Sequence, residues 1–389
     1  MAITFAAWPK KLMVGKGAIK DLAGEIKNLG KGRVMLVTDK MLRELPLLAT
    51  VENLLKSEGL EVFIYSDVIP TPIDTGVVNG VEMMKQCKPD IIVGLGGGSS
   101  IDTARAMNVL YNLGGTVRDY HVGDQKRQIT PGLMPFVAIP TTSGTGSEVS
   151  TGAPIMDSET NEELIMDDVL LIPDISVLDP EVTVSLPAFP TAYTGMDALT
   201  HLIEAYVSRI DFPVADGICL QGIKLVSKNL RTAVINGEDY EARENMAIAA
   251  TMGCMAFNIS QLGLVHGIAL QLMTTGAKRL PHGLANAIVL PRVMKYNAGF
   301  RPDKFADIAE AFGIDVRGLS PAEASISSIK EVEHLMTDIG LPFYLDDVGV
   351  DRGIIPELVA KTMECPLIWD NPRDVKAEDV EKILNACFR

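Results

Sequence analysis

One segment constrains the fold more than any other part of the chain: Asp90–Ala104 reads DIIVGLGGGSSIDTA. An apolar run is followed by three consecutive glycines, Gly96 to Gly98, and then by a helical pattern from Ile101. A strand, a glycine turn and a helix N-terminus predict an anion site, because glycines let backbone N–H groups approach a phosphate and the helix dipole favours its charge. The segment lacks the G-x-G-x-x-G fingerprint, and no lysine follows as in a P-loop. A tight turn between strand and helix is the alternative interpretation.

The surrounding half of the chain alternates short apolar runs with helical patterns. We predict strands at Arg33–Thr38, Glu61–Tyr65, Asp90–Leu95 and Phe136–Pro140, and helices at Pro46–Ser57, Asp74–Cys87 and Ile101–Tyr111. This alternation is typical of a parallel α/β sheet. From Ala192 onward helical periodicities dominate and no strand pattern is evident, with Val182–Tyr193 as the junction. We therefore predict an α/β domain over residues 1–185 and an all-α domain over residues 186–389.

Two further features at strand ends indicate a dinucleotide rather than a single phosphate. The loop Pro140–Glu148 is rich in small and hydroxyl residues, which leave room for a nucleotide but also commonly form local turns. Asp39 ends the predicted strand Arg33–Thr38, where a carboxylate can accept hydrogen bonds from a ribose and repel a 2′-phosphate. The alternative role of Asp39 is the N-cap of a helix that begins near Met41.

Charge and composition exclude several classes of partner. The net charge is −15, and the basic pairs are isolated, which argues against nucleic acid and against an anionic membrane surface. The five cysteines are scattered and never form a C-x-x-C pair, which indicates reduced thiols in a cytoplasmic protein. No secretory signal is evident, and no apolar stretch reaches the roughly 18 residues that a membrane span needs.

A candidate metal centre emerges from the histidines, of which the chain has only five. Asp197 and His201 lie four residues apart in a helical run and therefore share one helix face. His266 lies in LGLVHGIAL, and His282 follows a proline in LPHGLANAI. Three imidazoles and one carboxylate suit Fe²⁺ or Zn²⁺, with an open position for a substrate oxygen.

Each of these residues also has a simpler interpretation. Asp197 could start a helix, His201 could be a solvated surface residue, His266 could be a core histidine, and His282 could end a turn. Glu204 lies seven residues after Asp197 on the same helix face. It is either an orienting partner of a metal ligand or a solvated residue, and the sequence favours the second.

The chain resembles the iron-containing (group III) alcohol dehydrogenases along nearly its whole length. The residues that carry this resemblance are seven segments in a specific order: GGGSSIDTA at Gly96–Ala104, IPTTSGTGSEV at Ile139–Val149, LDPE at Leu178–Glu181, GMDALTHLIEAYVS at Gly195–Ser208, GLVHG at Gly263–Gly267, PHGLANAIVLPRVMKYN at Pro281–Asn297 and NPR at Asn371–Arg373.

The resemblance implies the two-domain fold and reversible hydride transfer between NAD(H) and a small alcohol, aldehyde or ketone, with Fe²⁺ or Zn²⁺ as Lewis acid. It implies a homo-oligomer, a dimer or higher. It assigns the metal ligands to Asp197, His201, His266 and His282, and it places Phe257 near the substrate pocket. The implied cofactor-binding residues are Asp39 at the adenosine ribose, Gly97, Gly98 and Ser99 at the pyrophosphate with Asp102 nearby, Thr141, Thr142 and Thr145 along the cofactor, and Leu178 beside the nucleotide.

Three departures from the family pattern concern proton transfer and substrate. The family usually has a second histidine four residues after the GLVHG ligand, and this position is Leu270 here. Leucine can neither donate nor accept a proton, so we expect a more apolar substrate pocket near Leu270. The stretch from His266 to His282 is about two residues longer than usual, and the extra length lies within Met273–Arg279. The third departure is Asn161–Glu163, which stands where relatives often have a lysine near the cofactor.

Other functions stay open at this point. A lyase of the dehydroquinate synthase kind shares this fold, but it needs several basic residues around a polyanionic substrate, and the segments near the ligands are mostly apolar. A non-enzymatic scaffold would not be expected to retain all four ligand positions. Within the dehydrogenases, the sequence leaves open whether the substrate is a primary alcohol, a diol or a hydroxy acid.

Overall fold

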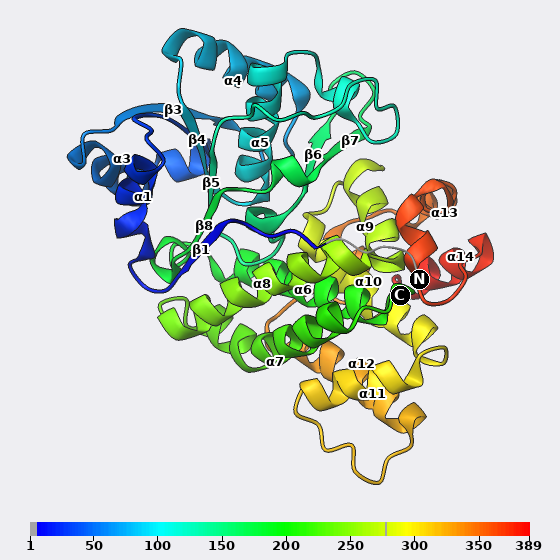
Figure 1. Ribbon diagram of the computed structural model, residues 1–389. Helices are drawn as coiled ribbons and strands as arrows, with labels where there is room; N and C mark the ends of the chain where they lie inside the picture. The colour runs from blue at the N-terminus through cyan, green and yellow to red at the C-terminus, as the bar shows by residue number, and fades with distance from the viewer. Residues whose placement is uncertain (1–5, 277) are drawn as a thin grey trace. The chain divides into compact units, whose positions relative to one another are not determined.

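The computed structural model describes residues 6–276 and 278–389, which divide into two compact units. One unit comprises Ala7–Thr142 and Gly146–Ser185, and the other comprises Leu186–Arg389 with the short segment Ser143–Thr145. In Figure 1 the first unit is drawn in blue to green and carries the sheet, whereas the helices of the second run from green to red. The two units are described separately below.

The first unit is built on a six-stranded parallel sheet with the strand order β1-β8-β5-β4-β2-β3. A separate antiparallel pair, β6 and β7, belongs to the same unit. The strands are β1 (Lys11–Val14), β2 (Arg33–Asp39), β3 (Glu61–Val68), β4 (Ile91–Gly96), β5 (Phe136–Pro140), β6 (Gly152–Met156), β7 (Glu163–Asp167) and β8 (Ile175–Leu178). The helices are α1 (Leu22–Asn28), α2 (Lys40–Arg43), α3 (Pro46–Ser57), α4 (Asp74–Cys87) and α5 (Gly98–Leu113).

Both faces of this sheet are buried, as the apolar runs of its strands require. On one face Met35 and Ile92 pack with side chains of α4 and α5, and on the other Leu36 and Val93 pack with side chains of α1 and α3. Because successive side chains of a strand point to opposite sides, each strand contributes to both cores. A continuous run such as IIV in β4 is therefore the pattern that a central parallel strand needs.

The second unit contains helices and no strand among its described residues. Its largest core joins buried side chains from nearly all of its helices, and α6, α7 and α8 pack closely against one another. Its helices are α6 (Ala188–Val207), α7 (Pro213–Ile235), α8 (Tyr240–Ser260), α9 (Leu264–Thr274), α10 (His282–Ala298), α11 (Pro302–Ala311), α12 (Pro321–Asp338), α13 (Ile355–Glu364) and α14 (Ala377–Ala386). In the described part of the chain no single helix is long and apolar enough to span a membrane, although the bent pair α8 and α9 passes that test jointly.

The predicted fold class, a parallel α/β domain followed by an all-helical one, is confirmed. The predicted strands agree with β2 to β5 to within a few residues, and the helices Pro46–Ser57 and Asp74–Cys87 match α3 and α4. Strands β1, β8, β6 and β7 were not predicted. The first two have only four residues each, and β6 and β7 lack the uninterrupted buried run of the equally short β5.

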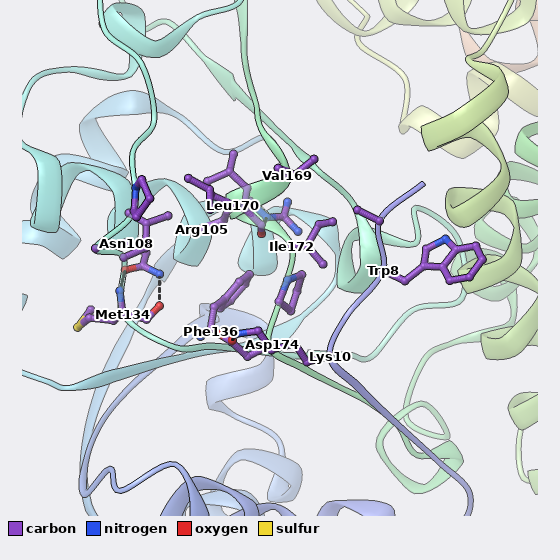
Figure 2. Close-up of a pocket in the computed structure, with 16 residues that line it drawn as sticks. Trp8, Lys10, Arg105, Asn108, Met134, Phe136, Val169, Leu170, Ile172 and Asp174 are labelled. Atoms are coloured by element: carbon purple, nitrogen blue, oxygen red, sulfur yellow. Dashed lines mark hydrogen bonds and ion pairs between the residues drawn. The ribbon is translucent and has the colours of Figure 1, made fainter. Parts of the chain in front are cut away.

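A pocket of about 320 Å³ lies at the amino ends of the sheet strands, beside the residues that precede β5 and β8 (Figure 2). Its polar lining groups are already engaged within the protein. Lys10 pairs with Asp174, and the Asn108 side-chain amide donates to the Met134 carbonyl at 2.8 Å. The buried Arg105 guanidinium donates to the Leu171 carbonyl at 3.0 Å. These contacts give the lining residues a structural role.

Candidate functional site

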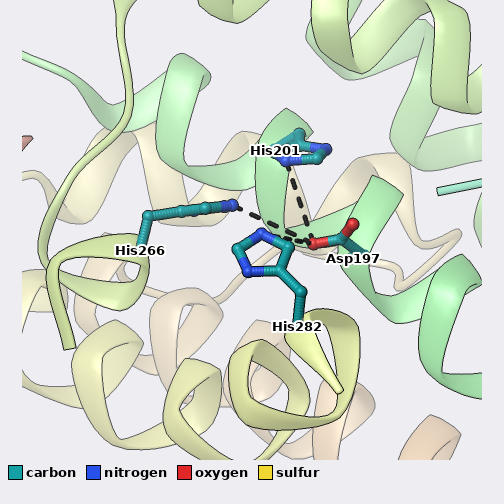
Figure 3. Close-up of side chains that lie close together, drawn as sticks. All are labelled: Asp197, His201, His266 and His282. Carbon is teal, nitrogen blue, oxygen red and sulfur yellow. Dashed lines mark ion pairs between the residues drawn. The ribbon is translucent and has the colours of Figure 1, made fainter. Parts of the chain in front are cut away.

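Four potential metal ligands come together in the helical unit, from three different helices (Figure 3). Asp197 and His201 lie one turn apart on α6, His266 lies in the first turn of α9, and His282 begins α10. One ligand atom from each residue lies within 4.8 Å of all the others. Asp197 Oδ1 is 3.8, 3.9 and 3.5 Å from Nε2 of His201, His266 and His282, respectively. The four side chains therefore point toward one common centre.

A glycine allows α10 to approach α6 this closely. A Cβ atom at Gly283 would collide with the Tyr193 carbonyl and lie 3.1 Å from Asp197 Cβ. The Pro-His-Gly sequence thus places an imidazole at the start of α10 and removes the side chain that would push the two helices apart. This contact explains why the histidine is followed by glycine.

The electrostatics of the cluster suit a cation. Burial lowers the pKa of His201 to about 3 and also lowers the pKa of His282, so these imidazoles are neutral and each has a lone pair on one ring nitrogen. Although burial opposes it, the three imidazoles hold the pKa of the Asp197 carboxyl below its ordinary value, and the carboxylate stays ionised. A buried carboxylate surrounded by neutral nitrogen donors lacks a full countercharge, which a divalent cation would supply.

Glu204 orients His266 from a buried position. Its carboxylate accepts a hydrogen bond from His266 Nδ1 at 2.6 Å, and it also accepts the backbone N–H groups of Val265 at 2.6 Å and His266 at 3.3 Å. With its proton on Nδ1, His266 presents the lone pair of Nε2 toward Asp197. The interpretation of Glu204 as a solvated residue is therefore wrong. The helical pattern of α6 could not reveal that the start of α9 packs on it.

The surroundings of the other two imidazoles differ from this arrangement. His282 Nδ1 lies 3.0 Å from the thioether sulfur of Met273, which is a weak acceptor. Within residues 6–276 and 278–389, the buried Nδ1 of His201 has no hydrogen-bond partner. The Phe257 ring lies 4.8 Å from the His201 ring, centroid to centroid. Leu270 lies on α9, one turn after His266, and is half-buried.

The simpler interpretations of three ligand positions are also wrong. Asp197 lies in the middle of α6 rather than at its start, and His201 is buried rather than solvated. His282 begins α10 instead of ending a turn. Because three imidazoles and one carboxylate converge, the donor set fits Fe²⁺ or Zn²⁺ better than a cation that prefers only oxygen ligands.

The glycine segment lies at the point where the order of the parallel sheet reverses. Strands β2 and β4 are neighbours in the sheet. The strand that follows β2 in the chain, β3, lies on the outer side of β2, whereas the strand that follows β4, β5, lies on the opposite side, next to β4. In open α/β sheets, ligands bind at such a switch point, beyond the carboxyl ends of the strands. Asp39 ends β2, and Gly97 is the N-cap of α5 directly after β4. Gly98 and Ser99 open α5, where backbone N–H groups lack helical partners and attract anions.

Comparison with known proteins identifies the family. The model of the iron-containing alcohol dehydrogenases matches residues 9–180, and the model of the C-terminal part of the Fe-containing alcohol dehydrogenase family matches residues 191–388. The chain belongs to the iron-containing alcohol dehydrogenase family. It is therefore an oxidoreductase that acts on alcohols, and the lyase and scaffold alternatives are set aside.

Individual relatives of this alcohol dehydrogenase match it over nearly their full length. It is 38% identical to the NAD-dependent methanol dehydrogenase of Bacillus methanolicus over 376 residues, which cover 97% of each chain. It is 38% identical to the 1,3-propanediol dehydrogenase of Klebsiella pneumoniae over 382 residues, covering 98% of this chain and 97% of the relative. Among solved structures, a 1,3-propanediol oxidoreductase superposes with a TM-score of 0.96, at 36% identity and full coverage of both chains.

In this dehydrogenase Asp39 caps the short helix α2, since its carboxylate accepts the backbone N–H of Leu42 at 2.9 Å. The alternative considered for Asp39 is thus present in the structure. It does not exclude contact with a ribose, because the side chain is half-buried and a carboxylate has two oxygens.

The structure gives Asp102 a contact within the protein. Its carboxylate lies 2.6 Å from Nη1 of Arg105, and both side chains are buried. Burial raises the pKa of Asp102, which the Arg105 guanidinium opposes. Arg105 also donates to the carbonyls of Ser147 and Gly152, so the pair fastens α5 to the segment after β5.

The remaining cofactor candidates lie near strand ends. Thr141 follows β5, and its backbone N–H donates to the Gly96 carbonyl at 2.9 Å, which joins the two loops. A Cβ at Gly97 would lie 3.4 Å from the Thr142 side chain. Thr145 belongs to the short segment that is grouped with the helical unit. Leu178 ends β8 and is almost fully buried.

Gly96 is the glycine of this loop that tolerates least change. Its φ is +147°, and a Cβ there would lie 2.5 Å from Ser100 Oγ and 3.3 Å from the Leu42 side chain. We expect Gly96→Ala to destabilise the protein by about 1–3 kcal/mol, the usual cost of a disfavoured backbone conformation. Urea unfolding measures this, with Gly32→Ala as control because a Cβ there meets nothing within 4 Å. Equal stability of the two variants would contradict the argument.

Proposed function

We propose that this chain is an NAD-dependent dehydrogenase that interconverts a small primary alcohol or diol and its aldehyde, with one divalent cation, Fe²⁺ or Zn²⁺, held by Asp197, His201, His266 and His282. The observation that carries the proposal is the buried convergence of four ligand atoms within 4.8 Å of one another. The names of two relatives support a small alcohol, since they act on methanol and on 1,3-propanediol.

When bound, the cation would supply Lewis-acid polarisation of the substrate oxygen, and the nicotinamide would exchange the hydride. The three imidazoles and the carboxylate would hold the cation. Glu204 keeps the His266 ring in the orientation that faces the centre. The Phe257 ring beside His201 adds an apolar wall next to the ligands.

We further propose that the first unit binds the dinucleotide. Gly97, Gly98 and Ser99 would hold the pyrophosphate at the N-terminus of α5, and Asp39 would meet the adenosine ribose. The further residues proposed to line the cofactor are Thr141, Thr142 and Thr145, and those proposed to lie near it are Asp102 and Leu178. The buried Asp102–Arg105 pair supports a positioning role for Asp102.

The proton released from the alcohol has no free imidazole partner near the ligands. Leu270 replaces the histidine that relatives usually have. Of the remaining histidines, His121 accepts the Ile165 backbone N–H in the sheet unit, and His334 is exposed on α12. We therefore propose that the proton leaves through water or through cofactor hydroxyls. The cytoplasmic location and the homo-oligomeric state stay predictions.

The proposed activity is tested by NADH formation from a panel of methanol, ethanol, 1-propanol, 1,3-propanediol and lactate, with Fe²⁺ or Zn²⁺ supplied. We expect turnover with at least one of the alcohols or with the diol. Turnover of lactate alone would instead indicate a hydroxy-acid dehydrogenase. No NADH formation with any of these compounds would refute the proposal.

The preference for NAD over NADP is tested at Asp39. Asn caps a helix as well as Asp does but has no charge, so Asp39→Asn separates the two roles of this side chain. If the carboxylate repels a 2′-phosphate, the ratio of kcat/KM for NADP to that for NAD should rise by about tenfold or more in Asp39→Asn and in Asp39→Gly. A ratio unchanged in both variants would show that Asp39 acts only as a cap.

A further inference from the structure

Asn286 lies among the four candidate ligands, although the sequence predicted no role for it. It is on α10, one turn after His282, and its side chain is fully buried. Its side-chain nitrogen Nδ2 is 2.7 Å from Asp197 Oδ1, 3.1 Å from His266 Nε2 and 3.1 Å from His282 Nε2. One amide nitrogen thus lies within hydrogen-bond distance of three of the four ligand atoms.

The chemistry of these neighbours fixes which end of the amide faces them. Asp197 Oδ1 is an acceptor, and His266 Nε2 is an acceptor because the other ring nitrogen donates to Glu204. The amide oxygen would meet these lone pairs with repulsion, so the N–H₂ end must face the ligands. The oxygen is buried and has no hydrogen-bond partner among the described residues, which leaves every partner of this side chain on the ligand side.

A cation and Asn286 compete for the same lone pairs. A ring nitrogen has a single lone pair in the plane of the ring, so it cannot bind a cation and accept an N–H at the same time. A carboxylate oxygen has a second lone pair and can do both. Cation binding therefore has to release the Asn286 amide from His266 and His282, whereas its hydrogen bond to Asp197 can persist.

We propose that Asn286 is a fifth residue of this centre, which satisfies the ligand atoms while no cation is bound and gives way when one binds. The inference rests on the proposed metal site. In this role Asn286 is a positioning residue: it keeps buried lone pairs hydrogen-bonded and the ligand side chains in place before the cation arrives. The ligand cluster can then form during folding without a cation.

The proposal predicts the direction of one measurable change. Both amide N–H groups are used in the cation-free site, and only one has a partner in the loaded site. Removing Asn286 therefore costs the cation-free state one hydrogen bond more than the loaded state. One net hydrogen bond corresponds to about a two- to tenfold change in a binding constant. Asn286→Ala should thus bind the cation about two- to tenfold more tightly than the unmodified protein.

The experiment measures the Kd for Zn²⁺ alone, by competition with a chromophoric chelator, on the full-length chain after removal of metal. Asn297→Ala is the matched control, because Asn297 is a buried amide on the same helix whose side chain is hydrogen-bonded to Asn371 instead of to a candidate ligand. We expect tighter binding in Asn286→Ala and no change in Asn297→Ala. Unchanged or weaker binding in Asn286→Ala overturns the proposal.

If Asn286→Ala does not fold, a second variant tests the same proposal. Asn286→Leu keeps a side chain of similar size and removes both N–H donors without adding a charge, so it should also bind Zn²⁺ more tightly, and unchanged or weaker binding would again overturn the proposal. Zn²⁺ binding by the unmodified protein distinguishes failure of the proposed metal site from failure of the proposed role of Asn286. If it binds no Zn²⁺, the proposed metal site itself fails, whereas binding of one ion per chain with no tightening in either variant removes only the role of Asn286.

Discussion

Alanine in place of His266 is expected to remove nearly all bound cation from this protein while leaving it folded. His266 carries one of the four candidate ligand atoms, and its ring is buried in the first turn of α9. Loss of an orienting partner usually lowers metal affinity by about 10–100-fold, and loss of a ligand itself should exceed that range. Because a bound cation contributes several kcal/mol to a transition state, NADH formation should fall by more than about 10³-fold.

Elemental analysis of the purified variant, with circular dichroism to confirm folding, measures this effect. His282→Ala should behave in the same way, because His282 supplies another atom of the same cluster. His334→Ala is the control, since His334 is exposed on α12 and pairs with Glu331 outside the cluster. Full metal content in both His266→Ala and His282→Ala would remove these residues from the ligand set.

Glu204 is expected to produce the second large effect, although we do not propose it as a ligand. Alanine at this position would leave the Nδ1–H of His266 and the backbone N–H of Val265 without an acceptor in a buried place. Each buried donor left without a partner costs about 1–3 kcal/mol, so the stability of the protein should fall. Without the carboxylate, the ring also loses its fixed orientation, and metal affinity should fall by about 10–100-fold.

Glu204→Gln tests which property of the side chain matters. Its amide oxygen can still accept from His266, but its N–H₂ end would face the backbone N–H of Val265, so we expect only part of the stability to return and the loss of Zn²⁺ affinity to be smaller than in Glu204→Ala. Thermal unfolding and chelator competition measure the two quantities separately. Wild-type Zn²⁺ affinity in Glu204→Ala would mean that the carboxylate only holds the start of α9.

The sequence predicted elements well where one local pattern is enough. Helices α3 and α4 have clear amphipathic periodicity, and β5 is a compact apolar run bounded by proline, so their limits agree with the structure. Strand β1 could not be predicted in this way. It has only four residues and is partly exposed, and it forms by pairing with β8 more than 160 residues later in the chain.

In the candidate site, too, features set by local sequence could be predicted, and features set by distant contacts could not. The spacing of Asp197 and His201 reveals a shared helix face, so part of the cluster can be predicted from local geometry. The roles of Glu204 and Asn286 depend on contacts with residues up to 62 and 89 positions away, respectively, and only the packing of α6, α9 and α10 brings these groups together. Their residue types alone are compatible with an ordinary solvated helix face.

The need for the cation is measured by NADH formation before and after the cation is removed. We expect chelation followed by gel filtration to abolish alcohol oxidation and about one equivalent of Fe²⁺ or Zn²⁺ per chain to restore it. Elemental analysis of the stripped protein and circular dichroism confirm that it is metal-free and folded. A stripped, folded protein that still oxidises alcohol at the full rate would contradict the central claim that Asp197, His201, His266 and His282 hold a cation required for the reaction.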